Sequence, residues 1–457
     1  MNLNREILRL AGPSILANIT VPLVGMVDIA VVGHLGRIGD FTSAALIGGI
    51  SIGTMLFDLL YWNFAFLRAG TAGLTAQAYG RFKSDDALIS QRAEAQNTIS
   101  LILLRALRIA LLSGIVLIAL QWVVVQAAFL VVQCSPEVRE LATQYFYIRI
   151  WAAPATLSLF AFKGWFIGMQ DTVRPMVADL LVNLLNIVLS AGLGFGIIFP
   201  ELGFRGVAFG TVIAQWAGFL YCVLAIWRRY PFALKRVHAE RKRDGQDGFF
   251  NMNRDLLLRS LGMIAVYIGF TVISARYGDL MLAVSTILMK LLMIFSYFTD
   301  GFAYAGEALT GRFIGEGSRD GVRSTIRGTF CWSLGVAALF MLVYGVGGVP
   351  LFRLMTSDPS VVEAGKPFLP WLLLMPLIGC AAFTWDGIFI GATASKDLRN
   401  STLLCAIGFF GVWFAGVALG GDSTPSRAIH LLMSAYFMHL AIRTVYLTAR
   451  YRQGAVV

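Results

Sequence analysis

Long apolar stretches, separated by short polar connections, run through the whole chain. A helix that crosses a membrane needs about 20 mainly apolar residues, and twelve stretches reach that length. The predicted spans lie near residues 8–33, 42–66, 99–126, 142–168, 173–198, 204–228, 256–278, 280–311, 327–353, 365–392, 399–420 and 425–447. This pattern predicts an all-α polytopic membrane protein with twelve transmembrane helices.

Composition agrees with this prediction, because 57% of the 457 residues are hydrophobic and only 14% are charged. Soluble domains carry about 25% charged residues. The apolar run after Arg5 and Arg9 is too long for a cleavable signal sequence, so we expect the first span to stay in the protein. The five cysteines are scattered without a paired motif, which indicates neither a disulfide framework nor a metal site.

Basic residues gather in the connections that follow the even-numbered spans, most densely between residues 228 and 254. Cytoplasmic loops carry such an excess of Lys and Arg, so both termini are predicted to be cytoplasmic. The net charge of +11 then follows from topology and from contact with anionic membrane lipid. No nucleic-acid partner is needed to explain it.

The long basic connection lies near the middle of the chain and divides it into two halves. We predict an N-terminal six-helix lobe over 1–233, a basic cytoplasmic linker over 234–254 and a C-terminal six-helix lobe over 255–457.

Short motifs recur across this division. Lys163–Gly168 resembles Asp386–Gly391 at an offset of 223 residues, and Thr75–Gly80 resembles Thr310–Gly315 at an offset of 235. A duplicated unit of six helices gives two lobes related by a pseudo-twofold axis along the membrane normal. Transporters of this kind hold their substrate between the lobes and work by alternating access.

Asp28 is an acidic residue inside the first apolar span. A charged side chain at the centre of a bilayer costs roughly 3 kcal/mol on insertion scales, and intramembrane acids commonly have a function. Asp28 is therefore our first candidate for an ion-binding residue. The alternative is a packing carboxylate that accepts hydrogen bonds from a neighbouring helix.

The fifth span carries a polar stripe at spacings of 4, 3 and 4 residues, which places its members on one helix face. Its members are Asp179, Asn183, Asn186 and Ser190. In a membrane such a stripe must face protein or water. It serves either as hydrogen-bonding contact between helices or as a partner surface for Asp28. An Asn side chain can donate to a carboxylate and accept from a protonated one.

The eighth span has a second polar stripe, formed by Lys290, Tyr297, Asp300, Tyr304 and Glu307. Together with Asp386 of the tenth span, it predicts a polar cavity in the second half of the chain. Lys290 and Asp300 are expected to neutralise each other across this cavity.

Four further residues in or near the spans are candidates of a weaker kind. Arg68 and Arg149 lie near predicted span ends, where their charged groups can reach the interface. Trp62 and Trp165, like Tyr304, could stack on a cationic substrate, although aromatic residues facing lipid are commoner. The chain has no phosphate-binding loop, zinc motif or nucleophile motif of an enzyme.

Several motifs of this chain resemble the multidrug and toxic compound extrusion (MATE) family, and its bacterial DinF branch most of all. They are Pro22–Gly36, Phe66–Gly80, Gly164–Pro175, Phe302–Leu309 and Trp385–Thr393. The resemblance extends over essentially the whole chain. It implies two six-helix lobes and export of small amphipathic, often cationic, compounds in exchange for a cation.

The resemblance also assigns expected roles to individual residues. The acid of the first helix, here Asp28, is taken as the proton-binding site, with Asn186 and Thr211 as its partners. Many relatives carry a second acid where this chain has Ser190, which leaves Asp28 more nearly alone. Asp386 resembles an acid that some relatives use for sodium in the second lobe.

Those relatives also carry a Glu in the seventh helix, whereas Leu261–Ser274 of this chain contains no acid. We therefore expect no metal-ion site in the second lobe.

The sequence as a whole predicts a proton-coupled antiporter, active as a monomer in the bacterial inner membrane and needing no cofactor beyond a proton gradient. The open alternatives are sodium-coupled antiport and a flippase for lipid or lipid-linked precursors from the same superfamily. A six-plus-six division favours the MATE family over flippases with fourteen spans. A membrane-embedded enzyme and a channel are both disfavoured.

Overall fold

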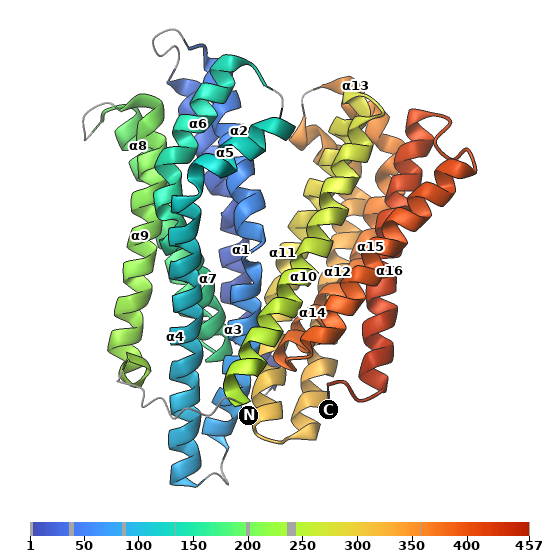
Figure 1. The fold of residues 1–457 in the computed structure, drawn as a ribbon. Helices are drawn as coiled ribbons and strands as arrows, with labels where there is room; N and C mark the ends of the chain where they lie inside the picture. Colours follow the sequence, from blue (N-terminus) through green and yellow to red (C-terminus); the bar gives the residue numbers. More distant parts are fainter. Residues whose placement is uncertain are drawn as a thin grey trace. The chain divides into compact units, whose positions relative to one another are not determined.

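A computed structural model describes residues 3–35, 41–84, 88–132, 134–197, 202–234, 244–356 and 358–456, and these are almost entirely helical (Figure 1). The chain divides into two compact units. The N-terminal unit comprises Leu16–Lys242, and the C-terminal unit combines Met1–Ile15 with Arg243–Val457. The predicted all-α fold class agrees with this architecture.

The helices of the N-terminal unit follow one another along the chain with short connections. They are α1 (Leu3–His34, from residue 16 onward), α2 (Ser43–Trp62), α3 (Ala65–Lys83), α4 (Ile89–Ala119), α5 (Gln121–Val131), α6 (Pro136–Arg149), η1 (Ile150–Ala152), α7 (Ala153–Gly168), α8 (Val173–Gly194), α9 (Gly203–Arg229) and η2 (Pro231–Leu234).

The C-terminal unit contains the longest helices of the chain. Its elements are α10 (Asp244–Ala275), α11 (Asp279–Gly315), α12 (Arg319–Met355), α13 (Pro359–Gly365), η3 (Lys366–Phe368), α14 (Leu369–Gly391), α15 (Ser395–Ala418) and α16 (Pro425–Arg452).

The first turns of α1 pack with the C-terminal unit. Glu6 is buried there and accepts a hydrogen bond from Arg312 of α11 at 3.3 Å. Ile15 lies directly against Gly301 of α11. The predicted lobes over 1–233 and 255–457 remain a prediction, and most of the predicted linker lies outside the described residues.

Among the described residues, eleven helical segments are long and apolar enough to cross a membrane. They cover eleven of the twelve predicted spans, and α1, with 32 residues, covers the first. The second span differs from the prediction because the helix continues to Lys83 after a break at Asn63 and Phe64. The Asn63 amide turns back to the Leu59 carbonyl at 2.7 Å and helps to end α2.

The two units repeat one close helix crossing, which supports the predicted duplication. In the N-terminal unit, Gly164 and Gly168 of α7 lie against the backbone carbonyls of Arg68 and Ala72 in α3. In the C-terminal unit, Gly387 and Gly391 of α14 lie against the carbonyls of Ala303 and Glu307 in α11. The offsets are again 223 residues for the glycines and 235 for the carbonyls. Because a Cβ atom would occupy the space of these carbonyl oxygens, only glycine permits so close a crossing.

The turn that follows α7 and the turn that follows α14 also share one backbone conformation. Gln170 follows α7 with φ 58°, and Thr393 follows α14 with φ 56°. These are the two non-glycine residues with positive φ in the described chain, and they lie 223 residues apart. An unusual conformation at equivalent positions indicates that the two halves share one backbone plan.

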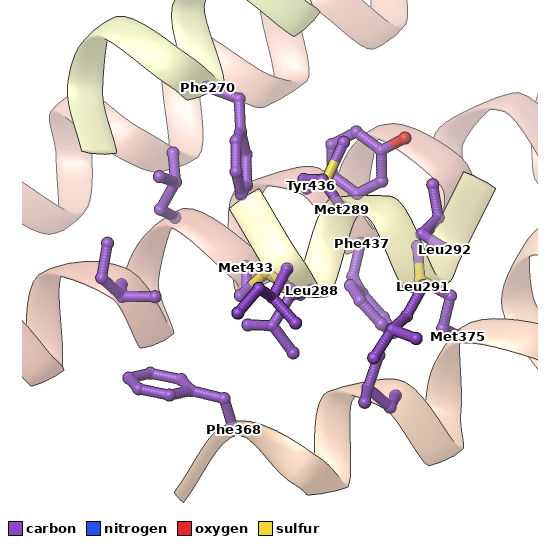
Figure 2. Packing of buried hydrophobic residues seen from close by; sticks show 14 of the residues in the cluster. Phe270, Leu288, Met289, Leu291, Leu292, Phe368, Met375, Met433, Tyr436 and Phe437 are labelled. Atoms are coloured by element: carbon purple, nitrogen blue, oxygen red, sulfur yellow. The ribbon is translucent and has the colours of Figure 1, made fainter. Parts of the chain in front are cut away.

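The core of the C-terminal unit forms where α10, α11, α14 and α16 meet (Figure 2). Phe270, Leu288, Met375 and Phe437 are among its buried residues. In membrane helices such packing provides much of the association, since lipid is as apolar as these side chains. This core supports the polar network described below.

We predict that Gly387→Ala destabilises the C-terminal unit, because the added Cβ would meet the backbone carbonyl of Ala303 and push α14 away from α11. Overpacking of this kind costs about 1–3 kcal/mol. Thermal unfolding of the purified protein in detergent measures the change. Gly335→Ala in α12 is the matched control, because a Cβ there would meet no atom within 4 Å. Equal stability of the two variants would contradict the tight crossing.

Candidate functional site

The carboxylate of Asp28 lies inside the N-terminal unit, near the C-terminal end of α1, and is only 3% exposed. Ser190 of α8, which is fully buried, donates a hydrogen bond from Oγ to Asp28 Oδ1 at 3.0 Å. The same Oγ lies 3.4 Å from the Val207 carbonyl of α9. One hydroxyl therefore lies between a carboxylate and a backbone acceptor, and its proton can point to either.

Asn186 and Thr211 form the next layer of this site. Asn186 Nδ2 donates to Thr211 Oγ1 at 2.8 Å, and Thr211 donates to the Val207 carbonyl at 3.2 Å. Both side chains are buried and interact electrostatically with Asp28. Asn186 Oδ1 is a buried acceptor to which no donor is bonded. The predicted partners of Asp28 on α8 and α9 are thus brought together with it.

The other two members of the α8 stripe have partners elsewhere. Asn183 donates to the Thr20 hydroxyl of α1 at 2.8 Å. Asp179 forms an ion pair with Lys163 of α7, with 2.6 Å between Nζ and Oδ2. Asp179 precedes Ser190 by eleven residues, about 16 Å along a helix. The stripe therefore combines both predicted uses: Ser190 serves Asp28 directly, and Asp179 and Asn183 hold α8 to α7 and α1.

Arg149 is a charged neighbour of this site that the sequence did not reveal. We predicted that it extends toward the interface. It is the last residue of α6 and lies in the interior of a helical segment of 33 residues. Its guanidinium donates to Tyr145 Oη at 3.0 Å and stacks 4.8 Å from the Phe57 ring centre. It interacts electrostatically with Asp28 and Asp58. The aromatic residues Phe57 and Tyr145 therefore hold Arg149 inside the unit.

Trp165 is likewise a packing residue. Its side chain is fully buried, and its indole Nε1 donates to the Ile99 carbonyl of α4 at 3.1 Å. The ring also packs against Tyr230, with 5.2 Å between the ring centres. Trp165 therefore has no free face on which a substrate cation could stack.

The predicted polar stripe of the C-terminal unit extends along one continuous helix, α11. Lys290 is exposed and lines a small cavity, whereas Glu307 is fully buried. Asp300 and Tyr304 lie between them, half-buried. Lys290 and Glu307 are about 25 Å apart along the helix axis, so these residues share a face but do not meet at one point. Lys290 and Asp300, about 15 Å apart on the same helix, are too distant to form a direct ion pair.

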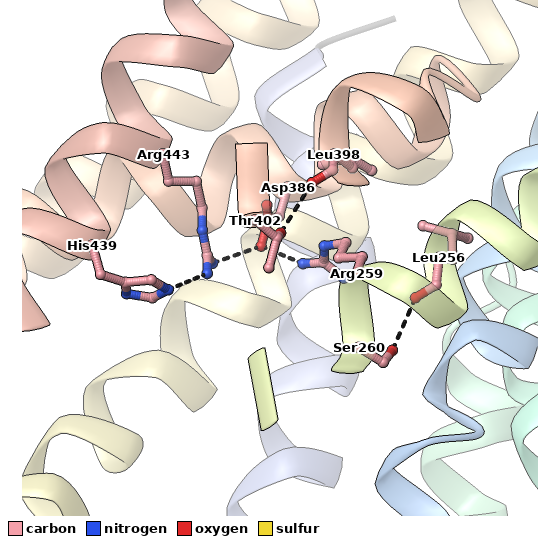
Figure 3. A network of polar contacts seen from close by, with 8 residues as sticks. All are labelled: Leu256, Arg259, Ser260, Asp386, Leu398, Thr402, His439 and Arg443. Carbon is pink, nitrogen blue, oxygen red and sulfur yellow. Dashed lines mark hydrogen bonds and ion pairs between the residues drawn. The ribbon is translucent and has the colours of Figure 1, made fainter. Parts of the chain in front are cut away.

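Asp386 of α14 belongs to a different network, in which two arginines approach it from opposite sides (Figure 3). Its Oδ2 accepts from Arg259 of α10 at 2.6 Å and from Arg443 of α16 at 3.1 Å. The second nitrogen of Arg443 lies 3.0 Å from His439 Nε2. Since arginine only donates, His439 accepts at this nitrogen and is neutral there. A carboxylate bound by two guanidinium groups does not offer a ready cation site.

Similarity to known proteins identifies the family to which this chain belongs. The sequence model of the MatE family matches residues 13–191 and 256–414. The chain therefore belongs to the MATE family of multidrug and toxic compound efflux transporters. It is a multi-pass membrane protein and a transporter rather than an enzyme.

Individual relatives are consistent with this membership. DNA damage-inducible protein F of Escherichia coli (strain K12) is 34% identical over 456 residues, which cover 98% of this chain and 92% of the relative. The probable multidrug resistance protein NorM of Thermotoga maritima is 24% identical, covering 90% and 84%. A crystal structure of a MATE protein in the bent conformation has a TM-score of 0.83 at 17% identity, covering 100% and 96%. The predicted two-lobe fold is thereby confirmed.

We predict that Ser190→Ala is destabilising at alkaline pH, where Asp28 is ionised and its hydrogen-bond donor would be lost. Hydrogen bonds to charged groups contribute about 1.5–3 kcal/mol. In an Asp28→Asn background the same change should cost clearly less, and thermal unfolding of all four proteins gives the coupling energy. Ser158→Ala is the control, because that buried hydroxyl bonds only its own helix at Pro154. Equal costs of Ser190→Ala in both backgrounds would show that the pair is not coupled.

Proposed function

We propose that this transporter exports small amphipathic cations in exchange for protons, and that Asp28 carries the proton. The observation that supports this most directly is the surroundings of the Asp28 carboxylate. It is buried, its direct partner is the Ser190 hydroxyl, and Asn186 Oδ1 nearby is an acceptor without a donor. Burial disfavours the charged form of a carboxylate, and these neighbours can serve both of its forms.

Between the ionised and the protonated form of Asp28, only the directions of the surrounding hydrogen bonds need to change. When Asp28 is ionised, Ser190 donates to it. When Asp28 takes up a proton, its new O–H can donate to Ser190 Oγ or Asn186 Oδ1, and Ser190 can turn its own proton to the Val207 carbonyl at 3.4 Å. The Asp28 carboxyl group keeps a hydrogen-bond partner in each state, so neither state leaves it without a partner inside the membrane.

Substrate export is coupled to proton uptake if the cationic substrate stabilises the state that binds it and the proton stabilises the state that releases it. An ionised Asp28 favours a nearby cation, and a proton arriving from outside removes that attraction. Rearranged bonds between α1, α8 and α9 would then alter α1, whose sequence contains Pro13, Pro22 and Gly25 as points of weakness. Substrate is released outward, and loss of the proton to the cytoplasm restores the binding state.

We predict that Asp28→Asn abolishes export driven by a pH gradient while the protein remains folded, because an amide cannot exchange a proton. Reconstituted vesicles with an imposed pH gradient and a fluorescent lipophilic cation measure transport. Asp179→Asn removes a carboxylate of the same helix stripe that is paired with Lys163, and it should retain gradient-driven export. Full export by the Asp28→Asn protein would overturn the proposal.

A second measurement tests coupling without transport. Substrate binding to the detergent-purified protein should release protons from Asp28 into a weakly buffered solution, and a pH-sensitive dye detects this release. The release should vanish in Asp28→Asn and persist in Asp179→Asn. Substrate binding without proton release in the unaltered protein would contradict direct competition at Asp28.

Sodium-coupled antiport is the second candidate, and one observation favours it. The Asp28 carboxylate, Asn186 Oδ1 and the hydroxyls of Ser190 and Thr211 make an all-oxygen set, which hard cations prefer. In the same vesicles, transport driven by a sodium gradient at equal pH would support sodium. Transport driven only by the pH gradient supports the proton.

A further inference from the structure

A small cavity lies between α10 and α11, wholly within the C-terminal unit. Its volume is about 90 Å³, and Lys290 lines it together with hydroxyl, aromatic and thioether side chains. The volume is well above the roughly 10–15 Å³ that holds one water, but it is below the roughly 300–1,000 Å³ of pockets for drug-sized ligands. The cavity can therefore accept one end of a molecule.

The lining of this cavity is amphipathic. Thr286 lies one turn before Lys290 on α11, so the Thr286 hydroxyl and the Lys290 ammonium are donors on one face. Thr271 donates its own proton to the Tyr267 carbonyl at 3.1 Å. Phe270 and Met289 provide apolar walls. A charged donor beside apolar surface suits a ligand with an anionic group and a hydrophobic chain.

The electrostatic surroundings also favour an anion. The helical segments that form the walls, residues 256–275 and 280–299, contain no acidic residue. Asp279 and Asp300 lie about 15 Å or more from Lys290 along α11. No acid near the cavity in sequence therefore offsets the Lys290 charge.

A contact chain connects the cavity with the arginine network. Phe270 of the cavity wall packs on Tyr436, with 5.8 Å between ring centres, and Tyr436 packs on His439 at 5.4 Å. His439 contacts Arg443, which shares the single carboxylate of Asp386 with Arg259. Two guanidinium charges against one carboxylate leave this network with an excess positive charge.

We propose that this cavity binds the anionic group of an amphipathic carboxylate, with the Lys290 ammonium as its charge partner. The inference goes beyond the proposed exchange of cations for protons: it gives the C-terminal unit an anion site and extends the ligands to amphipathic anions. Binding can be measured without any gradient, so its failure leaves the role of Asp28 untouched.

The test uses radiolabelled octanoate and the full-length protein in phosphatidylcholine nanodiscs, with empty nanodiscs as the blank. Octanoate should bind saturably, and octanol and octyltrimethylammonium, which share its chain but not its charge, should compete weakly. Lys290→Met should lower octanoate affinity roughly tenfold or more, as expected for loss of a charged hydrogen-bond donor. Lys290→Arg keeps the charge and should retain most of the affinity.

A control variant separates this site from the general effect of removing a lysine. Lys396→Met removes an exposed lysine outside the cavity and should leave octanoate binding unchanged. Unaltered affinity in Lys290→Met, or competition by octanol equal to that by octanoate, would overturn the proposal.

A final comparison identifies the source of the anionic group. Nanodiscs that contain phosphatidylglycerol should weaken octanoate binding if a lipid headgroup occupies the same site. Unchanged binding would indicate a dissolved carboxylate as the ligand. Both results support an anion site at Lys290. If phosphatidylglycerol weakens octanoate binding equally in the unaltered protein and in Lys290→Met, the lipid acts at another place.

Discussion

A polar group inside a membrane span needs a partner within the protein, and in the N-terminal unit this requirement accounts for the helices that surround Asp28. Water is absent from the bilayer core, and an unsatisfied backbone or side-chain group there costs several kcal/mol. The four polar residues of α8 meet it with four different partners, drawn from α1, α7 and α9. The polar contacts of α8 thus determine which helices lie around Asp28, and the proposed proton site is a consequence of helix packing.

The glycine crossings supply the complementary constraint on the backbone. At Gly164 and Gly168 in one unit, and at Gly387 and Gly391 in the other, two helices approach so closely that no side chain fits between them. The equivalent positions 163 and 386 precede these crossings directly. They carry Lys163, paired with Asp179, and Asp386, paired with Arg259 and Arg443. The backbone plan is repeated while the charge at this position is reversed.

Much of the fold could be predicted from the sequence because each span leaves a local signal. Apolar length gave the helices, and the recurrence of glycines at fixed offsets gave the duplication. The break at Asn63 was missed because no proline or glycine marks it. The packing of residues before Leu16 with the C-terminal unit was missed because it depends on contacts hundreds of residues away, such as Glu6 with Arg312.

The site was predictable where helical periodicity carries the information, as with Ser190 and Asn186 on one face of α8. It was not predictable where partners come from distant helices. Arg149 looked like a residue at a span end, although three-dimensional packing places it beside aromatic rings. Arg259, His439 and Arg443 gave no local signal at all, because a single arginine or histidine in a helix does not reveal which carboxylate it will meet.

The reversal of charge between Lys163 and Asp386 has a consequence for how the two halves respond to ions. A chain built from two copies of the first half would present Lys163 and its Asp179 partner twice, so both halves would respond to an ion in the same way. Two halves that share a backbone plan but differ in charge can respond differently to the same ion, while the ion gradient sets the direction of net transport.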